Sequence, residues 1–83
     1  GAFRCERAQD GLVVTPLPHL GPIPVALRLT RFGLSGADAV KSMTAIHPNG
    51  EAIRPVDFER AGDLLRFVTR RDEFAYRIRF ERL

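Results

Sequence analysis

Apolar and polar residues alternate through much of the chain with the two-residue period of β-strands. The clearest run is Phe74 to Phe80, in which large apolar residues at 74, 76, 78 and 80 alternate with alanine or arginine. Because successive side chains of a strand point to opposite faces, this run predicts a strand with one face in a hydrophobic core. No segment sustains the 3.6-residue period of a helix. The pattern therefore predicts an all-β fold.

Turn residues divide the rest of the chain into further short strands. Turn signals recur at residues 10–11, 20–22, 33–36, 48–50, 61–63 and 70–73, the spacing of all-β proteins. The expected strands lie at residues 2–6, 12–17, 25–30, 40–47, 51–54 with a continuation past Pro55, 64–69 and 74–80. About seven such strands are usually buried as two packed antiparallel sheets, so we expect an immunoglobulin-like sandwich. The Cys, Trp, Cys core of antibody domains is absent.

The apolar positions also predict how the last three strands pair. A two-residue type II′ turn at Gly62-Asp63 sets the first register, and a short loop over residues 70–73 sets the second. The expected facing pairs are Phe58 with Phe67, Glu59 with Arg66, Phe67 with Tyr76, and Leu65 with Ile78. A slip of one residue would expose every ring, so we expect these strands to share one sheet and one dry face.

Three upstream features predict a hairpin and two breaks in the ladders. Asn49-Gly50 is typical of a type I′ hairpin turn, which places Ile46 opposite Ile53. Pro55 interrupts the following strand, as expected where a strand bulges or crosses to the other sheet. The proline-rich segment 16–24 cannot lie in a central ladder, so it is interpreted as a crossover between sheets or a covered edge.

Length and composition indicate a single module over residues 1–83, which we expect to be part of a longer chain. Hydrophobic residues make up 45% and charged residues 28% of the sequence, a globular balance. The single cysteine, Cys5, cannot form an internal disulfide, so the core alone must hold the fold. No apolar run approaches the roughly 20 residues of a membrane span, and the sequence leaves the compartment open.

Residue types used in catalysis lack the spacing that catalysis requires. His19 and His47 do not have metal-site spacing, and Ser35 has the wrong glycine spacing for a nucleophile elbow. Cys5 is interpreted as a small strand residue. The acids are expected on the solvent side of a strand or as backbone caps in turns: Asp57 and Glu59 in the first group; Asp10, Asp38, Asp63 and Asp72 in the second. We therefore predict no enzymatic activity of this domain, and neither cofactor nor metal.

The arginines are the main candidates for binding. Twelve arginines and one lysine give the chain a net charge of +3. Arg66, Arg77 and Arg79 would share the wet face of the last strands, with Arg70, Arg71 and Arg82 near its end. Such a face suits an acidic polymer, but shielding of the sheet and pairing with Glu59, Glu73 and Glu81 is the favoured interpretation.

The aromatic residues argue against two kinds of ligand. Rings that point into the core, such as Tyr76 with its hydroxyl near the rim, cannot stack on nucleic-acid bases. Without Trp and with one Tyr, the chain also lacks the exposed planar rings of a dedicated sugar site, apart from Phe32 in a loop.

The segments Val25 to Leu29, Met43 to Gly50 and Phe74 to Ile78 resemble the all-β accessory domain that ends many bacterial glycoside hydrolases. The resemblance implies a module that packs against the catalytic domain of a carbohydrate-active parent chain and carries no active-site residue. The expected interface comprises Leu17, Leu20, Ile23 and Pro24. Two alternatives stay open: an independent module whose arginine face binds an acidic glycan or nucleic acid, and an assembly module that presents an edge strand. No membrane partner is expected.

Overall fold

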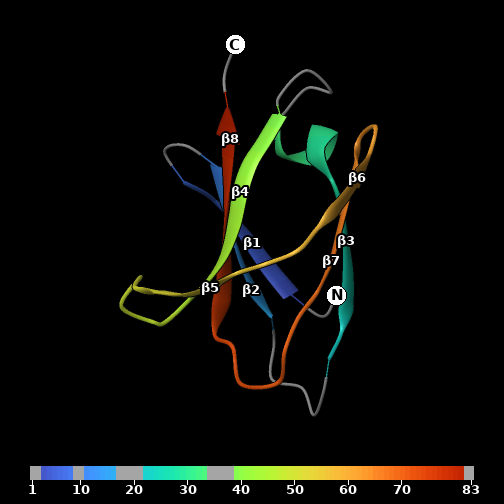
Figure 1. The fold of residues 1–83 in the computed structure, drawn as a ribbon. Coiled ribbons are helices and arrows are strands. Elements are labelled where there is room, and N and C mark those ends of the chain that lie inside the picture. The colour runs from blue at the N-terminus through green and yellow to red at the C-terminus, as the bar shows by residue number, and fades with distance from the viewer. Residues whose placement is uncertain (1–2, 9–10, 17–21, 34–38, 82–83) are drawn as a thin grey trace.

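The chain folds into two antiparallel sheets that face each other across a common core, which confirms the all-β sandwich (Figure 1). The structure is a computed structural model, and it describes residues 3–8, 11–16, 22–33 and 39–81. Five strands form one sheet in the order β1-β2-β8-β4-β5, and three form the other in the order β3-β7-β6. The elements are β1 (Phe3–Ala8), β2 (Gly11–Pro16), β3 (Pro24–Arg28), the 3₁₀ helix η1 (Leu29–Phe32), β4 (Ala39–Ile46), β5 (Ala52–Pro55), β6 (Glu59–Ala61), β7 (Leu64–Val68) and β8 (Ala75–Glu81).

The core forms from the inward side chains of both sheets. In β8 the residues Tyr76, Ile78 and Phe80 are buried, as the two-residue period predicts. Leu65 and Phe67 of β7 are buried from the opposite sheet. The expected dry interior of the last strands is therefore confirmed, with one exception. Phe74 lies before β8 begins and is 48% exposed, so its predicted inward position is wrong.

The predicted pairing of the last two strands is also wrong. β8 lies between β2 and β4, whereas β7 pairs with β3 and β6 in the other sheet. Phe67 and Tyr76 nevertheless meet, with ring centroids 5.3 Å apart, because they face each other across the core. Apolar matching cannot distinguish a neighbour in the ladder from a neighbour in the facing sheet, since both bury the same side chains.

The turn and the Glu59–Arg66 pair of the β6–β7 hairpin form as predicted, whereas the predicted pair of Phe58 with Phe67 is not part of the ladder. Gly62 has φ 59 and Asp63 does not have a positive φ, which fits a type II′ turn. Glu59 lies opposite Arg66, and both side chains are exposed. Phe58 precedes the ladder and packs half-buried against the core.

The hairpin between β4 and β5 differs from the prediction in turn type and register. Gly50 has φ 90, but Asn49 does not have a positive φ, so the turn is not type I′. Gly50 N donates to His47 O at 2.9 Å, which closes a four-residue turn with Pro48 in the second position that proline favours in type I turns. A bulge at Ala45/Ile46 then places Ile46 opposite Ala52.

Both predicted breaks in the ladders are crossovers between the sheets. β5 ends at Pro55, and residues 56–58 carry the chain to β6 in the three-stranded sheet, the yellow segment in Figure 1. The proline-rich segment leads from β2 in one sheet to β3 in the other. Residues 17–21 within it lie outside the described part of the chain.

The strand expected over residues 25–30 ends earlier than predicted. β3 stops at Arg28, and η1 follows, closed by Gly33 with φ 75. Phe32 is half-buried against the core, so it does not offer the exposed ring considered for sugar contact.

Candidate functional site

A groove of about 1130 Å³ lies on the side of the sandwich between the edge strand β5 and β7. It exists because β6 is short: the β6–β7 ladder stops at Glu59 opposite Arg66. The same register would place Asp57 opposite Val68, but residues 56–58 leave the sheet there. The groove is lined by buried Val25, Val56, Phe67 and Thr69, by Phe58 and Val68, and at its rim by Arg54, Arg66 and Arg70.

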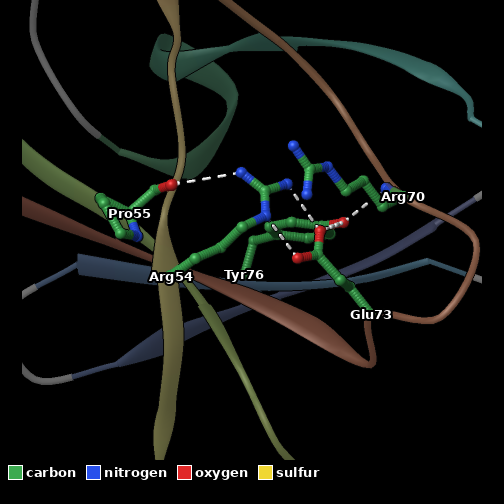
Figure 2. Close-up of polar contacts among 5 residues, drawn as sticks. All are labelled: Arg54, Pro55, Arg70, Glu73 and Tyr76. Atoms are coloured by element: carbon green, nitrogen blue, oxygen red, sulfur yellow. Dashed lines mark hydrogen bonds and ion pairs between the residues drawn. The ribbon is translucent and has the colours of Figure 1, made fainter.

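Four groups form a hydrogen-bonded cluster at one end of this groove (Figure 2). Arg54 donates from Nε to Glu73 Oε2 at 2.6 Å and from Nη2 to Glu73 Oε1 at 2.8 Å. Tyr76 Oη donates to Glu73 Oε1 at 2.7 Å and accepts from the Arg70 backbone N at 2.8 Å. Arg54 Nη1 also donates to the Pro55 carbonyl at 3.2 Å. We call Arg54, Glu73 and Tyr76 the polar latch.

The fold brings the latch residues together from three segments. Arg54 lies opposite buried Ala45 in the β4–β5 ladder, so its side chain points between the sheets. Tyr76 is an inward residue of β8, and its hydroxyl needs polar partners at the rim of the core. Glu73 lies in the crossover from β7 to β8, which brings its carboxylate within hydrogen-bonding distance of both Arg54 and Tyr76. The latch therefore ties β5 to that crossover.

The electrostatics of the latch indicate a structural role. Burial alone would raise the pKa of Glu73, but the hydrogen bonds from Arg54 and Tyr76 and the charges of Arg54 and Arg70 lower that pKa overall. Burial, followed by the hydrogen bond to Glu73, raises the pKa of Tyr76 to about 12. A general acid or base works best with a pKa near the working pH, and both groups are moved away from neutrality. At neutral pH Glu73 therefore stays ionised and Tyr76 stays neutral, as a structural ion pair requires.

The hydroxyl partner predicted for Tyr76 is confirmed, but Arg54 was missed by the sequence reasoning. The alternation of apolar and polar residues did indicate the position of Arg54. It turns Ala45 inward, and Arg54 points the same way because it lies opposite Ala45 in the ladder. An inward arginine at a sheet edge requires a counter-ion, because an unpaired charge is costly to bury. The correct counter-ion, Glu73, was among the acids expected to pair with arginines.

The three arginines predicted to share a face do not share one. Arg66 is an outward residue of β7, whereas Arg77 and Arg79 are outward residues of β8 in the facing sheet. The outer faces of two packed sheets point in opposite directions, so the predicted stripe is divided. The error follows from the wrong β7–β8 pairing. Arg77 and Arg79 remain together on the five-stranded sheet.

The predicted domain interface is only partly described. Leu17 and Leu20 lie outside the described residues. Ile23 is half-buried, and its backbone pairs with Thr69: Thr69 N donates to Ile23 O at 2.9 Å, and Ile23 N donates to Thr69 Oγ1 at 3.1 Å. Pro24 is exposed and lines the groove.

Two of the residues considered for catalysis, His47 and Cys5, lie in the described part of the chain. His47 is exposed in the β4–β5 turn, while His19 and Ser35 lie outside the described residues. Cys5 is half-buried in β1, and burial, then the charge of Glu6, raises the pKa of its thiol and reduces the reactive thiolate. Within the described residues, no group of three His, Cys, Asp or Glu side chains could hold a metal ion. No described helix is long and apolar enough to cross a membrane.

Three acids outside the latch face solvent or bind the start of η1. Asp57 and Glu59 are exposed, as predicted. Asp63 was expected to cap its own turn, but it accepts from the backbone N and the hydroxyl of Thr30, both at 2.8 Å. These two hydrogen bonds, the hydroxyl first, lower the pKa of Asp63. It therefore fixes the start of η1 against the β6–β7 turn.

A second hollow collects exposed apolar side chains. Ile53 is 40% exposed because the bulge displaces it from the ladder, and Phe74 is 48% exposed ahead of β8. Both line a hollow that also contains His47 and the adjacent charged residues Arg71 and Asp72.

Comparison of the chain with protein-family models, curated proteins and solved structures gave no match. The likeness to accessory domains of glycoside hydrolases therefore stays a prediction from the sequence.

Proposed function

We propose that this chain is a non-catalytic accessory module that binds a segment of another polypeptide in the groove between β5 and β7. The observation that carries the proposal is the gap beside Val68. There an apolar floor, an exposed apolar side chain and an unpaired strand edge occur together. In the form implied by the sequence resemblance, the segment belongs to the catalytic domain of a carbohydrate-active enzyme, which the module stabilises or orients.

The unpaired edge follows from the register of the three-stranded sheet. Thr69 N donates to Ile23 O on the β3 side, and backbone groups alternate in direction along a strand. The N–H and C=O of Val68 therefore face the other side, where β6 has ended. No described residue continues the ladder there, and the Val68 side chain is 54% exposed. An extended segment placed here would add backbone pairing to apolar contact, as in β-strand addition.

The polar groups nearby support binding over catalysis. The hydrogen-bonding groups of the latch are occupied mainly by one another, and neither Glu73 nor Tyr76 titrates near neutral pH. The separation of Arg66 from Arg77 and Arg79 also removes the three-arginine face on which an acidic-glycan site was predicted.

Hydrogen exchange tests the proposal. The Val68 amide should exchange rapidly in the isolated chain, because its N–H lacks a ladder partner. In the longer protein that the proposal expects, the amides of residues 66–70 should exchange at least about tenfold more slowly, since a bound segment covers them. The amide of Arg79, on the opposite sheet, is the internal reference. Equal exchange of residues 66–70 in both forms would reject the groove as an interface.

A further inference from the structure

We infer that the groove recognises a peptide segment in which an acidic side chain stands beside apolar ones. Its carboxylate would bind between the guanidinium groups of Arg54 and Arg70, and its apolar neighbours would cover the groove floor. This inference rests on the proposed function and names the chemistry of the partner.

Arg54 is a pre-positioned donor with unused capacity. A guanidinium has five N–H groups, of which Arg54 uses three, two toward Glu73 and one toward the Pro55 carbonyl. One N–H on each terminal nitrogen therefore remains for a further acceptor. Paired N–H groups of a planar guanidinium match the two oxygens of a carboxylate. Because Glu73 already fixes the side chain, little ordering is required on binding.

Arg70 places a second positive charge at the same end of the groove. Its backbone N is bound by Tyr76, whereas its guanidinium makes neither a hydrogen bond nor an ion pair with any described residue. Figure 2 shows this guanidinium directed toward that of Arg54. Its charge contributes to the lowered pKa of Glu73. Glu73 is the ion-pair partner of Arg54, so the guanidinium of Arg70 has no carboxylate paired with it among the described residues.

Two acids that line the groove limit where an acidic side chain of the peptide can lie. Asp57 and Glu59 are exposed on the lining near the end of β6, and Glu59 faces Arg66 across the ladder. An acidic side chain there would be repelled by these carboxylates. Because the charge of Asp57 also acts on Arg54, we place the acidic residue at Arg70 and at the N–H groups of Arg54 that are not yet bound.

The groove lining favours a peptide over an acidic sugar chain. Phe58, Val68 and buried Phe67 present hydrocarbon between the charged ends. Successive side chains of an extended peptide point to opposite sides, so leucines two residues before and two residues after a glutamate share its face and can contact this floor while the peptide backbone pairs with Val68. A polyanionic glycan would leave its hydroxyls against hydrocarbon and its further charges near Asp57.

An NMR titration with blocked model peptides tests the inference. The probes are Leu-Ser-Glu-Ser-Leu, which carries the leucines and the glutamate on one face, and the same peptide with Gln in place of Glu, and a galacturonate oligomer provides the acidic-glycan arm. The Glu peptide should shift the amide signals of Arg54, Val68 and Arg70 saturably. Its Kd should be at least about fivefold lower than that of the Gln peptide, because one charge-assisted contact is lost.

Two neighbouring arginines provide matched variants. R70Q should weaken binding of the Glu peptide at least about fivefold, whereas R71Q, with the same charge change but in the other hollow, should change it less than twofold. Both should keep the wild-type Tm, because neither guanidinium has a described partner.

Several results would overturn the inference. They are the absence of a saturable shift, equal binding of the Glu and Gln peptides, equal losses in R70Q and R71Q, and tighter binding of the galacturonate oligomer at the same amides. If residues 66–70 are protected in the longer protein while the peptides are not discriminated, the groove is an interface but its acidic chemistry is rejected. If neither occurs, the proposed function fails as well.

Discussion

Replacing Glu73 with Gln removes the charge at the centre of the polar latch while keeping the size of the side chain. The carboxylate accepts from Arg54 Nε, Arg54 Nη2 and Tyr76 Oη. A Gln can still accept with its oxygen, but its amide nitrogen would meet a donor of Arg54. The variant therefore loses at least one charge-assisted hydrogen bond and leaves the Arg54 guanidinium without its counter-ion.

The expected loss of stability follows from the burial of the two side chains. The Glu73 side chain is 5% exposed and that of Arg54 is 23% exposed. Removal of one partner from a fully buried ion pair costs about 3–5 kcal/mol. Because Arg54 is partly hydrated, we expect about 2–3 kcal/mol for E73Q. The Tm of a domain this size would fall by about 10–20 °C.

Urea unfolding at pH 7 provides the measurement. Tyr76 is the only tyrosine and the chain has no tryptophan, so tyrosine fluorescence reports directly on the latch. Far-UV circular dichroism reports on the sheets, and coincident transitions would support two-state unfolding. The matched control is E59Q, which makes the same chemical change on an exposed strand position and should stay within about 0.5 kcal/mol of wild type. Equal stabilities of E73Q and E59Q would refute the latch.

Three further predictions concern the ladder and the titration of the latch. In G11A the new Cβ would lie 1.7 Å from the Ile78 carbonyl oxygen, so the β2–β8 ladder must open, and urea unfolding should show a loss of about 3 kcal/mol or more. Because the pKa of Tyr76 is raised to about 12 from about 10, its contribution is complete below pH 10 and is lost as the pH rises through 12; Tm values from pH 9 to 12 should fall, and Y76F should show a flatter profile. Glu73 and Asp63 have lowered pKa values, so their contributions are complete above pH of about 4–5 and are lost as the pH falls through the lowered values; E73Q should flatten the acid limb of the Tm profile.

The fold class was predictable because it depends on local information. Alternation in residues 74–80 located β8 to within one residue, and Gly62-Asp63 located the β6–β7 turn together with its register. The partner of β8 was not predictable in this way. The inward faces of β2, β4 and β7 are all apolar, and pattern matching accepts each of them as a neighbour. The crossover at Pro55 was recognised because proline cannot donate to a ladder.

The candidate site was less accessible to sequence reasoning because it depends on those long-range pairings. The latch joins β5, β8 and the crossover between β7 and β8, and of its contacts only a partner for the Tyr76 hydroxyl, without its identity, was predicted. The groove exists because β6 begins only at Glu59, after the chain has crossed from the other sheet. The first residue of a strand is set by where such a crossover ends. Arg70 was predicted at the end of an arginine face, whereas the structure binds its backbone N to Tyr76 of the latch and places it on the lining of the same groove as Arg54.

The central claim is that Glu73 holds Arg54 as a fixed donor at the edge of the groove. A ¹H–¹⁵N NMR spectrum of the arginine Nε–H groups near pH 6 tests it most directly, with R54K used to assign the signal. We expect one Arg54 Nε–H signal that exchanges slowly with water, is shifted from those of exposed arginines and loses both properties in E73Q. An Arg54 signal that exchanges as fast as that of Arg71, before any substitution, would show that Glu73 does not hold Arg54.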